Sequence, residues 1–407
     1  MQLRIPPALK NRRFFMLWAG LLVSIAGSQM QLAAIHWHIR SLTGTPDPMA
    51  LGGIGLARIL PVIVFSLFGG AFADTYDRRT ILFVTQSLMA LTAAGLALLT
   101  FMGQIQIWHI YALTAVQAAA VAFDGPARQA IVPNIVSAED LPNAFSLNSI
   151  AFNAGAVIGP ALSGVVIATL GQGYTYFFNA VSFLAVILAL LAIGEIPQDL
   201  KKASGISLRA MGDGVRFIFS RQIILSTMIM DFFATFFASA NTMMPIVARD
   251  ILNVGEVGYG LLISAQAIGS VTAGLVISQI PVIRKKGRVF LAAVLVFGLA
   301  TVAFGFSNTF GLAMLTLVCI GAADTVSTII RNTIRQLQTP DHIRGRMTSI
   351  NQIFFQGGPQ LGEVESGLVA AAFGVPFAII SGGIGTIIAA GLIVLKWPEL
   401  RKYDDTH

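Results

Sequence analysis

The chain is poor in charged residues and almost free of cysteine. Only 11% of its 407 residues are Asp, Glu, Lys or Arg, whereas a soluble domain carries about 25%. This shortage excludes a soluble enzyme, a disordered scaffold and a nucleic-acid-binding protein, even though the net charge is +7. The single cysteine, Cys319, excludes a disulfide framework and a thiolate metal site.

Several catalytic motifs are also missing. The chain contains no Gly-Lys dipeptide, so it has no Walker A loop for ATP. It contains neither His-Glu-x-x-His nor Gly-x-Ser-x-Gly, the patterns typical of a zinc hydrolase and of a serine nucleophile. We therefore expect no cofactor, no metal ion and no enzymatic activity.

Long apolar runs are what the sequence has in abundance. Hydrophobic residues make up 55% of the chain, and the mean hydropathy is +0.77. A helix that crosses the ~30 Å hydrocarbon core of a bilayer needs roughly 20 mostly apolar residues. Such runs lie at about 14–39, 49–73, 80–102, 107–123, 144–170, 174–194, 222–248, 257–280, 289–307, 310–330, 346–372 and 374–396. The sequence therefore predicts an all-α membrane protein with twelve transmembrane helices.

The basic residues predict how these helices are oriented. All of the 26 Lys and Arg except Arg40, Arg58 and Arg249 lie near the ends of the runs on one side. Short loops rich in Lys and Arg stay in the cytoplasm. The turns on the other side, such as 103–106 and 171–173, carry no charge. Both termini are therefore expected to be cytoplasmic.

The chain reads as two related halves. The longest hydrophilic stretch follows six apolar runs and precedes six more, and it predicts one amphipathic helix around 208–219. Aligning the halves matches Arg128 with Arg331 and Gly159 with Gly362. Parallel repeats of this kind build transporters with a site near the midplane; the alternative is chance alignment of glycine-rich helices. The expected parts are an N-terminal six-helix bundle at 1–194, a linker at 195–221 and a C-terminal six-helix bundle with a short tail at 222–407.

The link between the second and third runs carries a spaced motif, whose main members are Gly70, Asp74, Arg78 and Arg79. It resembles motif A of the major facilitator superfamily, with Asp77 in place of the usual glycine. The resemblance implies that Asp74 meets the N-terminus of the eleventh helix and closes a cytoplasmic gate. Both arginines are expected to pair with Asp124, at the end of the fourth run. The alternative is a tight basic turn without a gating role.

The fifth run carries small residues and a proline, namely Gly155, Gly159, Pro160 and Gly164. This segment resembles motif C, which marks exporters within the same superfamily. Small residues and a proline kink are expected to allow close contact with a helix of the other half; generic glycine-rich packing is the alternative. Across the whole chain, the pattern is most similar to the branch that contains the enterobactin exporter and macrolide efflux proteins.

Five ionisable residues stand out inside the expected spans, where each costs at least ~2.5–3.5 kcal/mol; they are Arg58, Asp231, Asp324, Glu363 and Glu365. Arg58 is expected to pair with one of the two glutamates as an external gate, which protonation would open. Asp231 and Asp324, with Glu363, are the expected proton-coupling residues, because a carboxylate removed from water binds a proton more readily. The alternatives are a glutamate that faces an aqueous cavity without gating, and a structural pairing within the C-terminal half.

Polar and aromatic side chains on the expected cavity helices are candidates for substrate contact: Gln29, Gln31, Trp37, Gln117, Asn153 and Asn241. The leading hypothesis is a monomeric secondary active exporter in a bacterial inner membrane. It would move a small amphipathic molecule, such as a drug or a siderophore, outward in exchange for protons. The alternative is an uncoupled facilitator or lipid translocator on the same fold.

Overall fold

The structure is a computed structural model that describes residues 6–198 and 216–404. Within its helices, side chains are not described at 66–68, 70–71, 74, 240–241, 341–346, 348–350 and 352–353. The side chains of Gly70, Asp74 and Asn241 therefore lie outside the described part, as does most of the amphipathic helix expected around 208–219.

The chain forms two compact units. Unit 1 comprises Met1–Leu42 and Leu60–Ile206, and unit 2 comprises Thr43–Ile59 and Ser207–His407. The short segment Thr43–Ile59 thus groups with unit 2, although it lies early in the sequence. Glycine contacts explain this grouping, because a Cβ atom added at Gly52 would lie only 3.0 Å from the Cα atom of Gly367.

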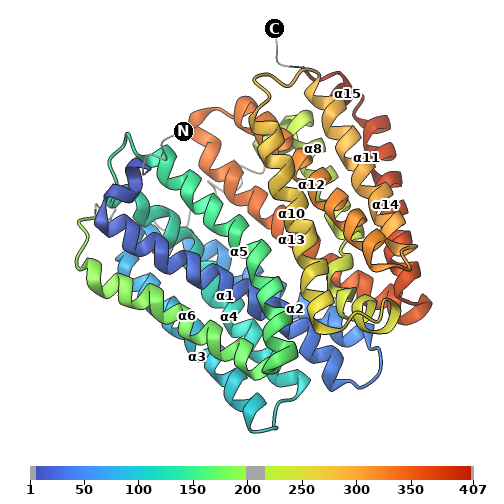
Figure 1. The fold of residues 1–407 in the computed structure, drawn as a ribbon. Coiled ribbons are helices and arrows are strands. Elements are labelled where there is room, and N and C mark those ends of the chain that lie inside the picture. The colour runs from blue at the N-terminus through green and yellow to red at the C-terminus, as the bar shows by residue number, and fades with distance from the viewer. Residues whose placement is uncertain (1–5, 199–215, 405–407) are drawn as a thin grey trace. The chain divides into compact units, whose positions relative to one another are not determined.

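Unit 1 is built entirely from helices in its described part, and these include η1 (Pro7–Lys10), α1 (Arg12–Leu42), the later part of α2 (Pro48–Thr75), α3 (Arg78–Phe101), α4 (Ile107–Ile131), η2 (Val132–Asn134), α5 (Leu141–Thr169) and α6 (Gln172–Ile193). Helix α1 packs along α5 and α6, and α3 packs along α4 and α6 (Figure 1). The start of the unit is tied down by side chains, since Asn11 Nδ2 donates to the Ile135 carbonyl at 2.8 Å and Trp18 Nε1 donates to the Leu147 carbonyl at 2.9 Å.

Unit 2 has less regular helices, namely α8 (Gln222–Phe237), η3 (Ala240–Met243), α9 (Met244–Ile246), η4 (Val247–Ile251), α10 (Gly255–Ser278), α11 (Lys286–Gly305), α12 (Phe310–Gln338), α13 (Asp341–Phe373), α14 (Val375–Lys396) and α15 (Glu399–Lys402). Helix α12 packs against α10 and α11, α14 packs against α11, and α8 packs against α13 and α14. Figure 1 shows α10, α11, α12 and α14 side by side.

The run expected as one span at 222–248 is broken in the structure. Helix α8 stops at Phe237, and a 3₁₀ turn, a single α turn and a π turn follow it. Pro245 contributes to the irregular segment, because proline has no N–H for the helical hydrogen bond and its ring clashes with the preceding turn. Discontinuous helices at membrane depth are typical of transporters.

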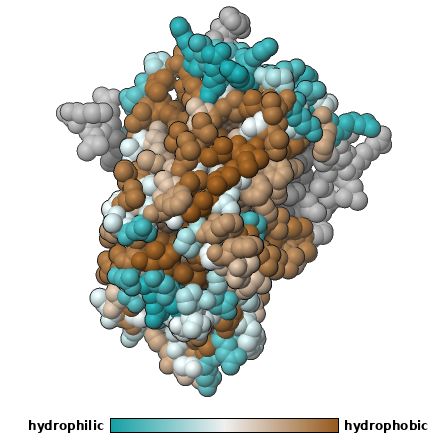
Figure 2. Space-filling view, turned by 90° about the vertical axis from the view of Figure 1, so that its right-hand side faces the viewer, coloured by the Kyte–Doolittle hydropathy of each residue, from teal (hydrophilic) through white to brown (hydrophobic). Residues whose placement is uncertain are grey.

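Ten helices within the described residues are long and apolar enough to cross a membrane. The expected spans at 222–248 and 346–372 are not among these ten, because α8 is short and α13 carries many polar residues. Exposed apolar side chains such as Leu395, which is 80% exposed, face outward from the helices. Figure 2 shows hydrophobic side chains across the middle of one face and hydrophilic ones at its ends. The protein is therefore an all-α, multi-pass membrane protein.

Candidate functional site

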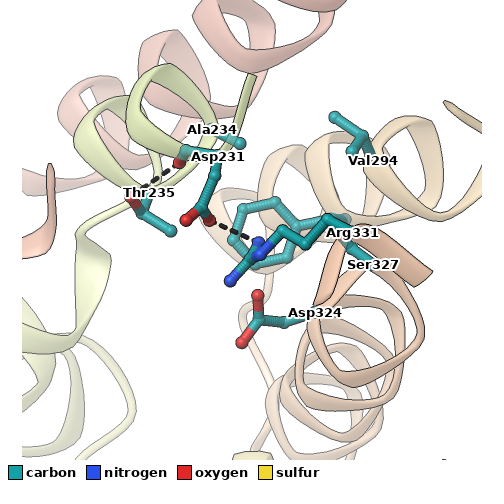
Figure 3. Close-up of a pocket in the computed structure, with 8 residues that line it drawn as sticks. Asp231, Ala234, Thr235, Val294, Asp324, Ser327 and Arg331 are labelled. Atoms are coloured by element: carbon teal, nitrogen blue, oxygen red, sulfur yellow. Dashed lines mark hydrogen bonds and ion pairs between the residues drawn. The ribbon is translucent and has the colours of Figure 1, made fainter. Parts of the chain in front are cut away.

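The most buried charges of unit 2 form an ion pair between two helices. Arg331 on α12 pairs with Asp231 on α8, and their side chains are 3% and 2% exposed (Figure 3). Thr235, one turn after Asp231, donates its hydroxyl to the Asp231 backbone carbonyl at 2.8 Å. A buried charge needs a partner to offset the loss of hydration. The pair therefore links α8 and α12 at a depth where neither charge could remain alone.

A second acid lies beside this pair. Asp324 precedes Arg331 by two helical turns on α12, and Figure 3 shows the Arg331 guanidinium pointing between the carboxyl groups of Asp231 and Asp324. Asp324 has no hydrogen bond or ion pair among the described residues. A cavity of about 10 Å³ separates these groups and is also lined by Thr235 and Ser327. That volume is near the lower limit for one water molecule.

The charges around Arg331 form a cluster of two acidic and two basic side chains. Arg335 lies one turn after Arg331 on α12, is buried, and donates to the side chain of Asn332. With both aspartates ionised, the formal charges of Asp231, Asp324, Arg331 and Arg335 sum to zero. Binding of one proton would leave a net positive charge at membrane depth, and this change is costly enough to influence a conformational equilibrium.

A second ion pair in unit 2 joins the first part of α2 to α13. Arg58 Nη1 lies 3.2 Å from Glu363 Oε1, and the two side chains are 27% and 12% exposed. Of the two glutamates expected as partners of Arg58, the structure therefore pairs it with Glu363. Glu365 is half-buried and forms no ion pair in the described part of the chain.

In unit 1, Asp124 does not pair with the two arginines of the motif A segment, contrary to expectation. It pairs with Arg128 on its own helix and accepts hydrogen bonds from Thr85 Oγ1 at 3.1 Å and Gln86 Nε2 at 2.7 Å on α3. Residues four apart on a helix are neighbours, so Arg128 lies next to the Asp124 carboxylate and pairs with it.

Arg78 and Arg79 instead stabilise the ends of neighbouring helices. Arg78 donates Nε to the Ala73 carbonyl at 3.0 Å and Nη1 to Asn134 Oδ1 at 2.6 Å. Arg79 donates Nε to the Leu190 carbonyl at 2.9 Å. Cations at helix C-termini are favourable because carbonyl groups there are unpaired and the helix dipole is negative.

Asp77, which replaces the usual glycine of motif A, caps helix α3. Its carboxylate accepts hydrogen bonds from the backbone N–H groups of Arg79 at 2.7 Å and Thr80 at 3.1 Å. This is the bonding of a helix N-cap, a position at which Asp is preferred. The departure from the family pattern therefore supplies a cap where a glycine would leave these donors unpaired. The Asp74 contact with a facing helix stays a prediction.

The motif C glycines Gly155 and Gly159 of α5 pack against α1 within unit 1, and the expected contact with a helix of the other half stays a prediction. A Cβ atom added at Gly159 would lie 2.7 Å from the Ala26 carbonyl oxygen, and one at Gly155 would lie 3.2 Å from the Ala26 backbone nitrogen. Pro160 and Gly164 are also buried. The two glycines are four residues apart and share one helix face, so both turn toward the same stretch of α1.

The polar candidates of unit 1 fall into two groups. Gln31 on α1 donates to Gln117 on α4 and accepts from Asn179 on α6, at 2.6 and 2.7 Å. The other candidates lie apart from these three hydrogen-bonded amides. The Cβ atom of Gln29 lies near Gly159 of α5, and Asn153 is exposed and donates to the Ser149 carbonyl at 2.9 Å.

Trp37 is 2% exposed and therefore packs as a core residue rather than lining an open surface.

Reasoning from the sequence missed three residues that form buried ion pairs or hydrogen bonds, namely Arg128, Arg331 and Asn179. The repeat alignment of the two arginines was the available signal, because both prove to be ion-pair partners of buried aspartates. Asn179 had no comparable signal, being one polar residue in an apolar run.

The described part of the chain is an all-helical membrane protein with buried ion pairs and one broken helix. A POT family transporter solved with 5-aminolevulinic acid superposes with a TM-score of 0.78 at 13% identity, over 96% of this chain and 97% of that one. The chain therefore shares its fold with that transporter. The sequence model described as transmembrane secretion effector matches residues 6–407, and the chain belongs to that family.

Three relatives show which branch the chain is similar to. The multidrug efflux pump Tap of Mycolicibacterium fortuitum is 25% identical over 391 residues, covering 93% of this chain and 94% of its own. The staphyloferrin A transporter of Staphylococcus aureus is 27% identical over 370 residues, covering 89% and 90%. The enterobactin exporter EntS of Citrobacter koseri is 25% identical over 338 residues, covering 83% and 80%. The predicted membership of the major facilitator superfamily is confirmed.

Proposed function

We propose that the protein is a secondary active exporter that moves small amphipathic molecules, drugs or siderophores, out of the cell in exchange for protons. The relatives support export, because their names describe a multidrug efflux pump, a staphyloferrin A transporter and an enterobactin exporter. The lack of a Walker A loop supports an ion gradient rather than ATP as the energy source.

The observation that carries the coupling is the arrangement around Arg331. One arginine serves Asp231 as an ion-pair partner, while Asp324 lies beside it without a partner among the described residues. A lone carboxylate at this depth is stabilised by taking up a proton. We infer that Asp324 carries the proton and that the Asp231–Arg331 pair holds the site in place, with Glu363 as a second acid that responds to protonation.

A proton that enters from the outside would then bind to Asp324. Neutral Asp324 leaves the cluster with one excess positive charge, which weakens its packing and favours the alternative conformation of the helices. Release of the proton to the cytoplasm restores the balance and resets the transporter. Alternating access of this kind fits twelve helices in two six-helix bundles, with both termini in the cytoplasm of a bacterial inner membrane and the transporter acting as a monomer.

Transport into inside-out membrane vesicles tests the proposal. Two lipophilic probes, erythromycin and tetraphenylphosphonium, are offered with the membrane potential clamped, and the lumen is made either acidic or equal in pH to the medium. We expect accumulation of at least one probe to be faster with an acidic lumen and to fall when the pH gradient is collapsed. Equal rates in both conditions would contradict proton antiport and favour an uncoupled facilitator or lipid translocator.

A further inference from the structure

A chain of three amide side chains crosses unit 1 and takes no part in the proposed coupling. Asn179 on α6 donates Nδ2 to Gln31 Oε1 on α1 at 2.7 Å, and Gln31 donates Nε2 to Gln117 Oε1 on α4 at 2.6 Å. Asn179 and Gln31 are 0% and 1% exposed, whereas Gln117 is only half-buried. This amide chain therefore has a closed end at Asn179 and an open end at Gln117.

The helices are shaped around the closed end. A Cβ atom added at Gly27 of α1 would lie 2.7 Å from Asn179 Oδ1 and 2.9 Å from Ser182 Cβ, so a larger residue would push α6 away. Ser182 donates its hydroxyl to the Asn179 backbone carbonyl at 2.7 Å and also lies 3.0 Å from Asn179 Oδ1. The position of Asn179 is thus fixed from both sides, and this in turn holds Gln31.

The direction of the hydrogen bonds determines whether Gln117, at the open end, presents a donor or an acceptor. The amide oxygens of Gln31 and Gln117 each accept from the amide before them, so the amide nitrogen of Gln117 is the last donor. That nitrogen has no hydrogen-bond partner in the described part of the chain. Gln117 lies about 15 Å along α4 from Ile107, at 1.5 Å per residue, and therefore near the middle of a ~30 Å hydrocarbon core. A donor at that depth gains from a partner that water does not supply.

We propose that Gln117 binds the transported molecule by donating its amide N–H to a carbonyl oxygen. The amide chain through Gln31 and Asn179 keeps the Gln117 oxygen occupied, so that a donor and not an acceptor is presented. The ligands selected in this way are lipophilic molecules that carry a ketone, ester, lactone or amide carbonyl. The inference rests on the proposed export function and assigns it a substrate chemistry.

The experiment compares erythromycin, which has lactone and ketone carbonyls, with tetraphenylphosphonium, which has no hydrogen-bond acceptor. Initial rates of uptake into inside-out vesicles give KM for each probe. Gln117→Leu removes the donor. For this variant we expect a roughly five- to tenfold rise in the KM for erythromycin and no change for tetraphenylphosphonium.

Two further variants separate positioning from a general effect of the substitution. Gln31→Met leaves Gln117 in place but removes its anchor, so it should also raise the KM for erythromycin selectively. Gln104→Met is the control with the same change of side chain, because Gln104 is exposed in the turn after α3, and it should change neither KM. Equal effects of Gln117→Leu on both probes, or no effect on either, would overturn the inference.

Binding of erythromycin to the purified protein in lipid nanodiscs keeps the two proposals distinguishable. If vesicles of the wild-type protein transport neither probe, the export function fails, yet the affinity for erythromycin still decides the role of Gln117. A five- to tenfold weaker affinity in Gln117→Leu, with Gln104→Met unchanged, supports the carbonyl contact. Equal affinities in the wild type and in Gln117→Leu overturn it.

Discussion

Arg331 on α12 and Asp231 on α8 form an ion pair from which solvent is almost completely excluded, with side-chain exposures of 3% and 2%. Such a pair is costly to desolvate and even costlier to break, because the remaining partner keeps its charge without compensation. The pair is thus both a structural link between two helices and a fixed charge beside Asp324. Its two roles can be separated by measuring stability and transport in the same variants.

The first prediction concerns the stability of this ion pair. Asp231→Asn and Arg331→Gln should each destabilise the purified protein by about 3–5 kcal/mol, since each leaves one buried charge alone. The double variant should be less destabilised than either single one, because both charges are gone. Thermal unfolding in detergent, followed by tryptophan fluorescence, measures the effect. Additive losses in the double variant would mean that the two side chains do not interact.

The second prediction separates coupling from folding. Asp324→Asn leaves the cluster with the same excess positive charge as protonation does, but it breaks no hydrogen bond or ion pair of the described residues, so it should lower the unfolding temperature less than Asp231→Asn or Arg331→Gln. Transport should continue but lose its dependence on an imposed pH gradient, because the remaining cluster cannot change its charge at this position. Vesicle uptake with and without the gradient measures this. A variant that keeps the full response to the gradient would remove Asp324 from the coupling role.

The third prediction concerns Arg58 and Glu363, which lie 3.2 Å apart. Arg58→Ala should change both the rate of transport and its dependence on external pH, because Glu363 would lose its ion-pair partner. The charge-swapped variant Arg58→Glu with Glu363→Arg should restore part of the wild-type behaviour. Glu365→Gln serves as the matched control, since Glu365 forms no ion pair in the described part of the chain. Transport by Arg58→Ala with an unchanged rate and an unchanged pH response would contradict a gate.

Much of the fold could be predicted from the sequence, because apolar run length alone determines where a helix can cross a bilayer. The broken segment after Phe237 could not, since hydropathy averages over Pro245 and does not register the backbone bond it removes. The grouping of Thr43–Ile59 with unit 2 could not be predicted from the sequence either. It depends on contact between Gly52 and Gly367, which are far apart in the sequence.

The site residues were predictable as individuals but not always as partners. The cost of a charge in a span singled out Arg58, Asp231, Asp324 and Glu363. Arg331 was overlooked as a partner because the apolar run ends just before it, whereas helix α12 continues to Gln338 and keeps the arginine buried. Asp124 was assigned the wrong arginines, since its neighbour four residues along the same helix is closer than any residue of the preceding link.

The fourth prediction tests the motif C contact between α5 and α1. A Cβ atom at Gly159 would lie 2.7 Å from the Ala26 carbonyl oxygen and 3.0 Å from the Met30 nitrogen, both of which are backbone atoms. Backbone cannot move aside as a flexible side chain can, so the two helices would have to separate. Gly159→Ala should therefore destabilise the protein by about 1–3 kcal/mol, the usual cost of overpacking.

Gly391 in α14 is the matched control for that substitution, because a Cβ atom added there meets nothing within 4 Å. Gly391→Ala should leave stability unchanged or raise it by roughly 0.5–1 kcal/mol, since alanine favours a helix over glycine. Thermal unfolding of both variants in the same detergent makes the comparison. If the two substitutions had equal effects, the close approach of α5 to α1 would not depend on Gly159, and the motif would have no packing role here. A loss confined to Gly159→Ala instead places the motif in the internal packing of unit 1, where it sets the distance between two of its longest helices.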